Sequence, residues 1–150
     1  MTDPGTVAAV YAALFAGHQL ADHWIQTQHQ ADTKGQPGWR GRLACVRHVA
    51  TYGATQLVAL GLLALAADLT VSPAGLAAGM AINLTTHYLA DRRTPLLWLA
   101  ERTGSTRFWR LGMPRAGRDD NPSLGTGAYA LDQSWHYGWL FVAAILTTII

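Results

Sequence analysis

The 150-residue sequence has little charge, one lysine and a single cysteine. Only 13% of its residues are charged, against about 25% in ordinary soluble domains, and half are hydrophobic. Cys45 alone excludes an intrachain disulfide and a zinc site built on paired cysteines. Because Met1 to Gly5 contains no basic residue, we expect no cleavable signal peptide. These absences argue against a disulfide scaffold and against an ordinary soluble domain.

The basic residues are confined to two segments. All eleven Lys and Arg residues lie within 34–47 and 92–118, although the sequence pI is near 9.0. Positive charge gathered beside hydrophobic stretches is typical of the cytoplasmic loops of membrane proteins. We therefore expect this charge to orient the chain in a bilayer, and we expect no nucleic-acid partner.

Long apolar stretches predict an all-α, helical integral membrane protein. Residues 49–67 carry no formal charge, and a bilayer core needs about 20 such residues. Ser72-Pro73 and Thr94-Pro95 are helix start signals, a capping residue followed by proline. We expect residues 1–150 to form a single membrane-embedded domain. It is predicted as a four-span up-down bundle with spans at about 6–27, 42–67, 73–91 and 127–150.

The connections between these spans set the predicted topology. Residues 28–41 are predicted as a polar loop, and a short interfacial helix after span three stops at Gly104. Residues 105–126 are predicted as a long loop because they show no clear periodicity. The two basic segments join spans one to two and three to four, so both lie on one side. The sequence thus predicts a multi-pass protein with both termini outside.

Seven ionisable residues interrupt the apolar spans near the basic side. They are called the His–Asp cluster and comprise His18, Asp22, His48, His87, Asp91, Asp132 and His136. At 1.5 Å per helical residue, all of them fall within roughly 5–15 Å of one membrane face. Six of the seven form i,i+4 pairs, which share a helix face. Ionisable residues inside a span are costly and tend to serve function.

Imidazole combined with carboxylate favours Zn²⁺, Fe²⁺ or Mn²⁺ over thiolate-preferring ions. We expect one or two divalent transition-metal ions, with the ligands His18, Asp22, His48, His87, Asp91 and His136. Asp132 is predicted to be a ligand or general base, and Gln26 and Gln133 to orient water or substrate. Tyr52 and Asn83 each lie four residues from a cluster histidine and are expected to orient it. There are two alternatives to a metal site: a path for protons or ions, and hydrogen bonds that only join the helices.

The order of these residues resembles a known family. The stretches that carry the resemblance are His18-x-x-x-Asp22-x-x-x-Gln26, Lys34, His48, His87-x-x-x-Asp91 and Asp132-Gln133-x-x-His136. They are similar to the domain-of-unknown-function 3307 family of small bacterial and phage membrane proteins. The resemblance implies a bacterial cytoplasmic (inner) membrane protein and supports these motif residues as the functional ones. It implies no reaction, since the family has no established activity. A looser similarity to bacterial inner-membrane metal-dependent hydrolases is an analogy.

The expected function is metal-dependent hydrolysis of an amphiphilic (phospho)ester at the cytoplasmic face. Two other classes stay open: a metal-ion or proton transporter or channel using the same cluster, and a non-catalytic membrane interaction module. The half of each span far from the cluster is nearly all apolar, which disfavours transport. The expected partners are the lipid bilayer and a lipid-like substrate, and a homo-oligomer is compatible with the sequence.

Overall fold

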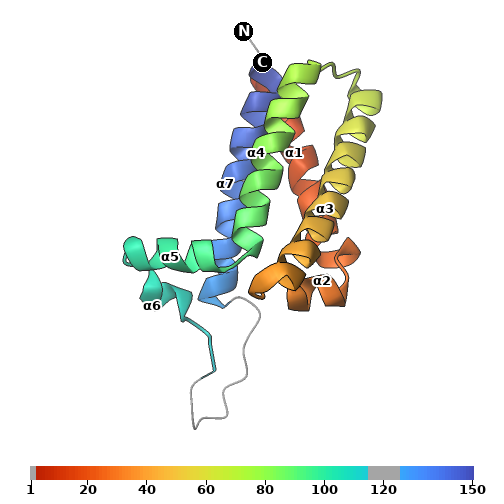
Figure 1. Cartoon of the computed structure of the whole chain (residues 1–150). Coiled ribbons are helices and arrows are strands. Elements are labelled where there is room, and N and C mark those ends of the chain that lie inside the picture. Colours follow the sequence, from red (N-terminus) through yellow and green to blue (C-terminus); the bar gives the residue numbers. More distant parts are fainter. Residues whose placement is uncertain (1–2, 115–125) are drawn as a thin grey trace.

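The computed structural model describes residues 3–114 and 126–150, and within these ranges it contains helices and no strand. The long helices form an up-down bundle (Figure 1) and are α1 (Pro4–Leu20), α3 (Gly38–Ala67), α4 (Pro73–Asp91) and α7 (Gly127–Ile149). The expected all-α class is confirmed. Helix α1 begins and α7 ends at the same end of the bundle (Figure 1).

Shorter helices gather at the other end of the bundle. These are the π-helical turn η1 (Ala21–Ile25), α2 (Gln28–Thr33), α5 (Thr94–Arg102) and α6 (Thr106–Trp109). Helix α5 projects sideways from the bundle, with α6 beside it (Figure 1). The start predicted from Ser72-Pro73 is confirmed, and the Ser72 hydroxyl accepts the Gly75 N–H at 2.9 Å. Helix α5 begins at Thr94 itself, so Thr94 is not the predicted cap: the N-cap is Arg93, and no side chain caps the helix. The cluster lies toward this end, which the short helices enclose.

Residues 28–41 are not the polar loop that the sequence predicted. They contain α2 and the start of α3, which begins at Gly38 rather than near Arg42. Helix α2 forms because Thr27 and Gln30 make a reciprocal capping box. The Thr27 hydroxyl accepts the Gln30 N–H at 3.2 Å, and the Gln30 side-chain oxygen accepts the Thr27 N–H at 2.9 Å.

The two other predicted boundaries that differ lie at span one and at the long loop. Span one was expected to run to about residue 27, but its α-helix ends at Leu20 and a π-helical turn follows. The expected loop 105–126 contains the short helix α6, whose Trp109 N–H bonds to the Ser105 carbonyl at 2.9 Å. Residues 115–125 of that loop lie outside the described residues.

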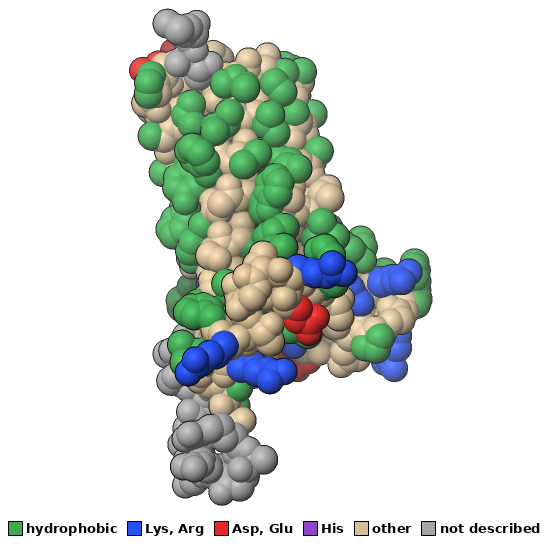
Figure 2. All heavy atoms as spheres, turned by 90° about the vertical axis from the view of Figure 1, so that its left-hand side faces the viewer, with side chains coloured by type: hydrophobic (Ala, Val, Ile, Leu, Met, Phe, Trp, Pro, Cys, Tyr) green, Lys and Arg blue, Asp and Glu red, His purple; other side chains and the backbone are tan. Residues whose placement is uncertain are grey.

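Polar side chains are buried in the bundle while apolar side chains cover its surface. Gln56 is fully buried, whereas Val58 and Leu62 on the same helix are 61% and 63% exposed. Figure 2 shows hydrophobic side chains over the shaft of the bundle, with Lys and Arg side chains at its lower end. Among the described residues, one helix, α3, is long and apolar enough to cross a membrane. Only 22% of its apolar window is buried, so α3 is apolar where a soluble helix would be polar.

Helices α4 and α7 pack closely because glycines lie at their contact. A Cβ on Gly75 would lie 2.6 Å from the Thr147 carbonyl oxygen. A Cβ on Gly79 would overlap the Thr147 hydroxyl and lie 2.8 Å from the Ala143 carbonyl oxygen. Small residues spaced four apart let helix backbones approach in this way, as is common between membrane helices. This contact fixes the two helices that together carry His87, Asp91, Asp132 and His136.

Candidate metal centre

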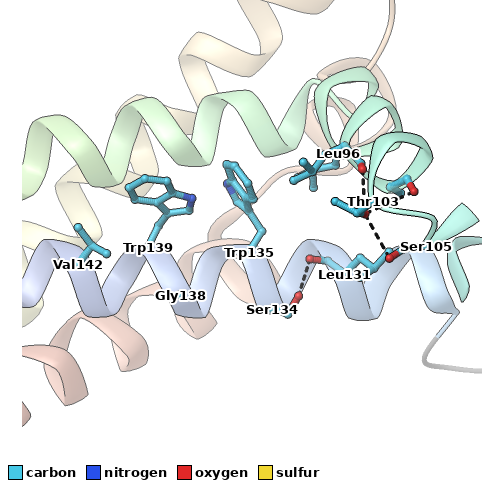
Figure 3. Close-up of a pocket in the computed structure, with 11 residues that line it drawn as sticks. Leu96, Thr103, Ser105, Leu131, Ser134, Trp135, Gly138, Trp139 and Val142 are labelled. Atoms are coloured by element: carbon cyan, nitrogen blue, oxygen red, sulfur yellow. Dashed lines mark hydrogen bonds between the residues drawn. The ribbon is translucent and has the colours of Figure 1, made fainter.

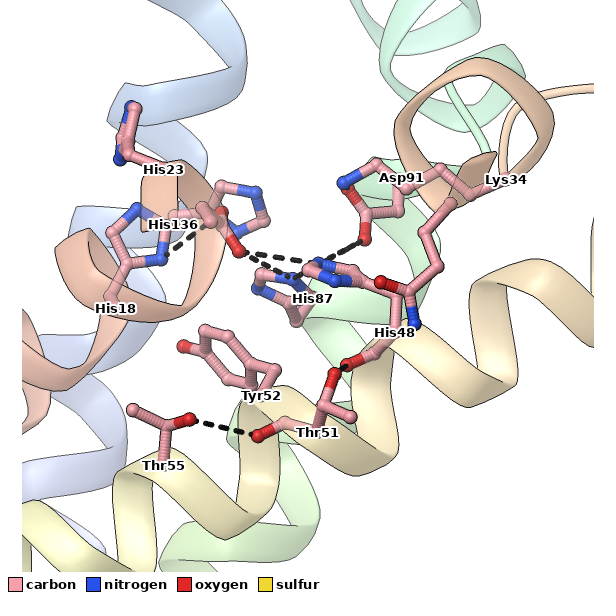
Figure 4. A network of polar contacts seen from close by, with 12 residues as sticks. His18, His23, Lys34, His48, Thr51, Tyr52, Thr55, His87, Asp91 and His136 are labelled. Atoms are coloured by element: carbon pink, nitrogen blue, oxygen red, sulfur yellow. Dashed lines mark hydrogen bonds and ion pairs between the residues drawn. The ribbon is translucent and has the colours of Figure 1, made fainter. Parts of the chain in front are cut away.

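Each of the four long helices contributes one histidine to the cluster. At most 3% of each residue is exposed, and they are His18 (α1), His48 (α3), His87 (α4) and His136 (α7). Their rings point toward a common region between the helices (Figure 4). The carboxylates come from η1, from the last residue of α4 and from α7, and they are Asp22, Asp91 and Asp132. The fold therefore brings together the seven residues that the sequence placed in one layer.

The tightest part of the cluster is formed by two imidazole nitrogens and two carboxylate oxygens. The Nε2 atoms of His48 and His87 are 3.0 Å apart. Asp22 Oδ1 lies 3.2 Å from His48 Nε2 and 3.5 Å from His87 Nε2. Asp91 Oδ2 lies 3.3 Å from both nitrogens. Asp22, His48 and His87 meet the geometric requirements for a shared ion, with Asp91 beside them.

These separations fit the coordination sphere of a small divalent ion. Nitrogen and oxygen ligands bind Zn²⁺ at about 2.0–2.2 Å, so neighbouring ligands of a tetrahedral ion are roughly 3.3–3.6 Å apart. The five separations given above range from 3.0 to 3.5 Å. Within the described chain, the Nδ1 atoms of His48 and His87 and the facing oxygens of Asp22 and Asp91 make no hydrogen bond. Asp22 Oδ1 and the Nε2 atoms of His48 and His87 converge at a spacing that suits a cation as their common partner.

Aromatic stacking holds the ring of His87, in addition to the contact of its Nε2 atom with His48. The Tyr52 ring stacks on it with centroids 3.7 Å apart, and the His136 ring stacks at 4.3 Å. The Tyr52 hydroxyl donates to Asn83 Oδ1 at 3.0 Å, so Asn83 acts on His87 only through Tyr52. The sequence placed both residues near the cluster, but the stacking arrangement was not foreseen.

Lys34 is a functional candidate that reasoning from the local sequence missed. Its ammonium lies 2.6 Å from Asp91 Oδ1, and only 9% of the residue is exposed. The Arg92 guanidinium donates to the carbonyl oxygens of Lys34 and Gln36 and so holds the end of α2 in place. Lys34 was placed in a loop and was singled out only by the family resemblance. Lys34 directly follows α2, and the capping box at Thr27 was the signal that could have indicated an ordered helix before it.

A polar cavity of about 470 Å³ opens beside the cluster. The predicted catalytic residues Gln26, Asp132 and Gln133 all line it, together with Asp22 and Asp91. The Gln133 amide donates to Asp132 Oδ2 at 3.3 Å, and the Asp132 side chain is 30% exposed. The cations of Lys34 and Arg93 also border the cavity. The structure therefore gives the predicted catalytic residues access to a cavity that three carboxylates and two cations line.

An apolar groove of about 430 Å³ lies between α5 and α7. Figure 3 shows Trp135 and Trp139 along it, with Leu96 at one side. The Trp135 indole N–H donates to the Thr86 carbonyl at 3.0 Å, which fixes that ring. Leu96 lines both this groove and the polar cavity, so the two spaces are neighbours.

Comparison of the chain with protein-family profiles, with curated proteins and with solved structures found no match. The resemblance to the domain-of-unknown-function 3307 family therefore stays a prediction. The functional conclusion rests on the chemistry of the cluster and its surroundings.

Proposed function

We propose that this chain is a four-span membrane protein that uses divalent metal bound in the His–Asp cluster to hydrolyse an amphiphilic ester or phosphoester at the cytoplasmic face. The observation that carries the proposal is the convergence of buried imidazole and carboxylate groups at ligand spacing beside an open polar cavity. The Asp22 and Asp91 carboxylates would bind the metal together with the histidines. Bound metal would supply a nucleophilic hydroxide and polarise the substrate oxygen.

The membrane part of the proposal is supported by the distribution of polar and apolar surface. Apolar side chains such as Leu62 and Leu65 are exposed along α3, while His48 and Gln56 on the same helix are buried. Lipid would cover the exposed apolar surface, and polar groups in a bilayer need partners inside the bundle. The basic residues at one end match the charge bias of cytoplasmic loops. This charge bias supports an orientation with the cluster near the cytoplasmic face and both chain ends outside.

The substrate class follows from the two neighbouring spaces. A phosphate or carboxyl head group in the polar cavity would meet Lys34 and Arg93, and its scissile bond would lie beside Asp132. An acyl or prenyl tail would extend past Leu96 into the groove that Trp135 and Trp139 line. A substrate that enters from the bilayer uses both spaces, whereas a soluble ester uses only the cavity.

The catalytic roles follow from contacts in the cavity. Asp132 is the general base, because its carboxylate is partly exposed to the cavity and close to His136. Gln133 orients Asp132 by donating to it, and Gln26 offers an amide that makes no hydrogen bond to any described residue. Beyond the cluster, apolar side chains such as Val10, Leu14 and Leu140 form a core in which Gln56 and Thr147 are isolated buried polar groups. This filling favours hydrolysis over transport, since a transport path needs polar groups through the full depth.

The test compares Asp132→Asn with a matched control, Asp68→Asn, at the exposed turn after α3. Protein purified in mild detergent is loaded with Zn²⁺, Fe²⁺ or Mn²⁺, and its metal content is measured. Turnover is then followed on phosphorylated and acylated lipids and on short-chain soluble analogues of each. We expect wild type and Asp68→Asn to prefer the lipids. Asp132→Asn should lose about 10²–10⁴-fold in turnover, the usual worth of a general base, with metal content and melting temperature unchanged.

Two outcomes would overturn the proposal. Metal-loaded wild type that hydrolyses none of the panel, with an Asp132→Asn variant that mainly lowers the melting temperature, would indicate a structural role. Equal turnover of lipids and their soluble analogues would refute the amphiphilic substrate class.

A further inference from the structure

Asp22 faces two different sets of histidines with its two carboxylate oxygens. Its Oδ1 atom lies 3.2 Å from His48 Nε2 and 3.5 Å from His87 Nε2. Its Oδ2 atom lies 3.5 Å from His18 Nδ1. A carboxylate that offers one oxygen to each of two donor sets has the arrangement that bridges metal pairs.

The hydrogen bonds around His18 fix which of its nitrogens carries a proton. A carboxylate accepts only, so the Gln133 amide nitrogen faces Asp132 and the Gln133 oxygen faces the other way. That oxygen lies 3.2 Å from His18 Nε2 and also accepts the Tyr137 hydroxyl at 3.0 Å. Since a carbonyl oxygen cannot donate, His18 Nε2 carries the proton. In the neutral ring the Nδ1 lone pair then points toward Asp22 Oδ2.

Two facing acceptors need a cation between them. His18 Nδ1 is buried and makes no hydrogen bond within the described chain. Among residues 3–114 and 126–150, the carboxylate at ion-pair distance from it is that of Asp22, at 3.5 Å. The cation is either a second proton on His18 or a metal ion. A metal ion is favoured because a ring nitrogen of His136 lies within 4.8 Å of a ring nitrogen of His18.

His136 completes a second set of ligands. His18, His87 and His136 each offer an atom within 4.8 Å of the others. The Nε2 atom of His136 is buried, makes no hydrogen bond to a described residue, and lies 3.6 Å from Asp132 Oδ2. Because His87 Nε2 already faces His48 and two carboxylates, we assign His87 to the first set. His18 and His136 remain for the second.

We propose that the cluster holds two divalent ions bridged by Asp22, an inference that rests on the proposed metal function. His48, His87, Asp91 and Asp22 Oδ1 bind the first ion, and His18, His136 and Asp22 Oδ2 bind the second. Four protein ligands close the first site, as in structural zinc sites, whereas three leave a position for water or substrate. Asp132 Oδ2 lies 3.6 Å from His136 Nε2 and lines the polar cavity, so the second ion would be the one that activates water.

The experiment measures ions per chain and whether they interact. Wild type is loaded with Mn²⁺, and its bound metal is counted by elemental analysis. Electron paramagnetic resonance then reports whether the spins are exchange-coupled, which requires ions joined by a short bridge. The variants are His136→Ala, Asp22→Asn and, as a control, His29→Ala in the exposed surface of α2. Circular dichroism confirms that each variant keeps its helix content.

We expect two coupled ions in wild type and in His29→Ala, and one uncoupled ion in His136→Ala. Asp22→Asn should lose the coupling and at least one ion, because an amide cannot bridge as a carboxylate does. One ion per chain in wild type would overturn the two-ion centre and leave the metal-dependent hydrolase standing. Two ions without coupling would overturn the Asp22 bridge. No bound metal would overturn the proposed function itself. The wild-type spectrum alone decides these points if a variant fails to fold.

Discussion

Replacing Gly79 by alanine should separate α4 from α7 by a measurable amount. The new Cβ would lie 2.8 Å from the Ala143 carbonyl oxygen, and ordinary contact needs roughly 3.5 Å, so the backbone must yield by about 0.7 Å. Overpacking of this kind costs about 1–3 kcal/mol. Alanine also favours a helix over glycine by about 0.8–1.0 kcal/mol, which offsets part of that cost. We expect a net loss of roughly 0–2 kcal/mol.

Gly61→Ala is the matched control because a Cβ there meets nothing within 4 Å. It should stabilise the chain by about 0.8–1.0 kcal/mol through helix propensity alone. Subtracting the change in unfolding free energy of one variant from that of the other cancels the helix propensity. The remaining difference of about 1–3 kcal/mol is the packing cost at Gly79. The assay is reversible unfolding in mixed detergent micelles with increasing SDS, followed by circular dichroism. A Gly79→Ala protein as stable as Gly61→Ala would refute the close α4–α7 contact.

Three further predictions concern the metal and the topology. Removing metal with a chelator should lower the melting temperature. Free Zn²⁺ at about 100 times its Kd should then restore roughly 2.7 kcal/mol of unfolding free energy. Equal melting temperatures with and without metal would contradict this prediction. Lys34→Met should weaken metal binding about 10–100-fold, because Lys34 orients the Asp91 carboxylate. Competition with a coloured chelator measures the metal affinity, and an unchanged affinity would count against Asp91 as a ligand. In a Cys45→Ser background, an impermeant thiol reagent added to cells should label Ser72→Cys and spare Gln36→Cys, and the reverse pattern would invert the proposed orientation.

The helical class and the sharpest boundaries could be predicted because they depend on local chemistry. Ser72 caps α4 and proline occupies its first position, and both effects act within one turn. The i,i+4 pairs were predictable for the same reason: His87 and Asp91 lie 3.3 Å apart because the helix repeat puts them on one face. Helix α2 depends on equally local chemistry, the capping box at Thr27, but it was not predicted. Gly35 and Pro37, which follow it, favour a turn, so the whole segment was predicted as a loop.

The partners that join different helices could not be read from the sequence. Lys34 meets Asp91 across 57 positions of chain, and nothing near Lys34 distinguishes it from a solvated loop lysine. The stacking of Tyr52 on His87 depends on how α3 and α4 face each other. The π-helical turn that carries Asp22 changes the direction of its side chain. The sequence Ala21–Ile25 contains no proline or glycine that would have indicated this turn. The ordered motif residues were predictable, but the way that Asp22 is shared between two histidine sets was not.

The buried polar side chains also have a calorimetric consequence. Unfolding exposes groups such as Gln56, Asn83 and Thr147, and hydration of polar surface lowers the heat capacity by about 0.26 cal/K/mol per Å². In a bilayer or micelle, the apolar exterior would stay covered when the helices separate, so it would add little to the heat-capacity change. The heat-capacity change should therefore fall well below the roughly 12–15 cal/mol/K per residue of soluble domains. Stability should then vary almost linearly with temperature, and cooling should not bring the decline that curved stability profiles show below their maximum.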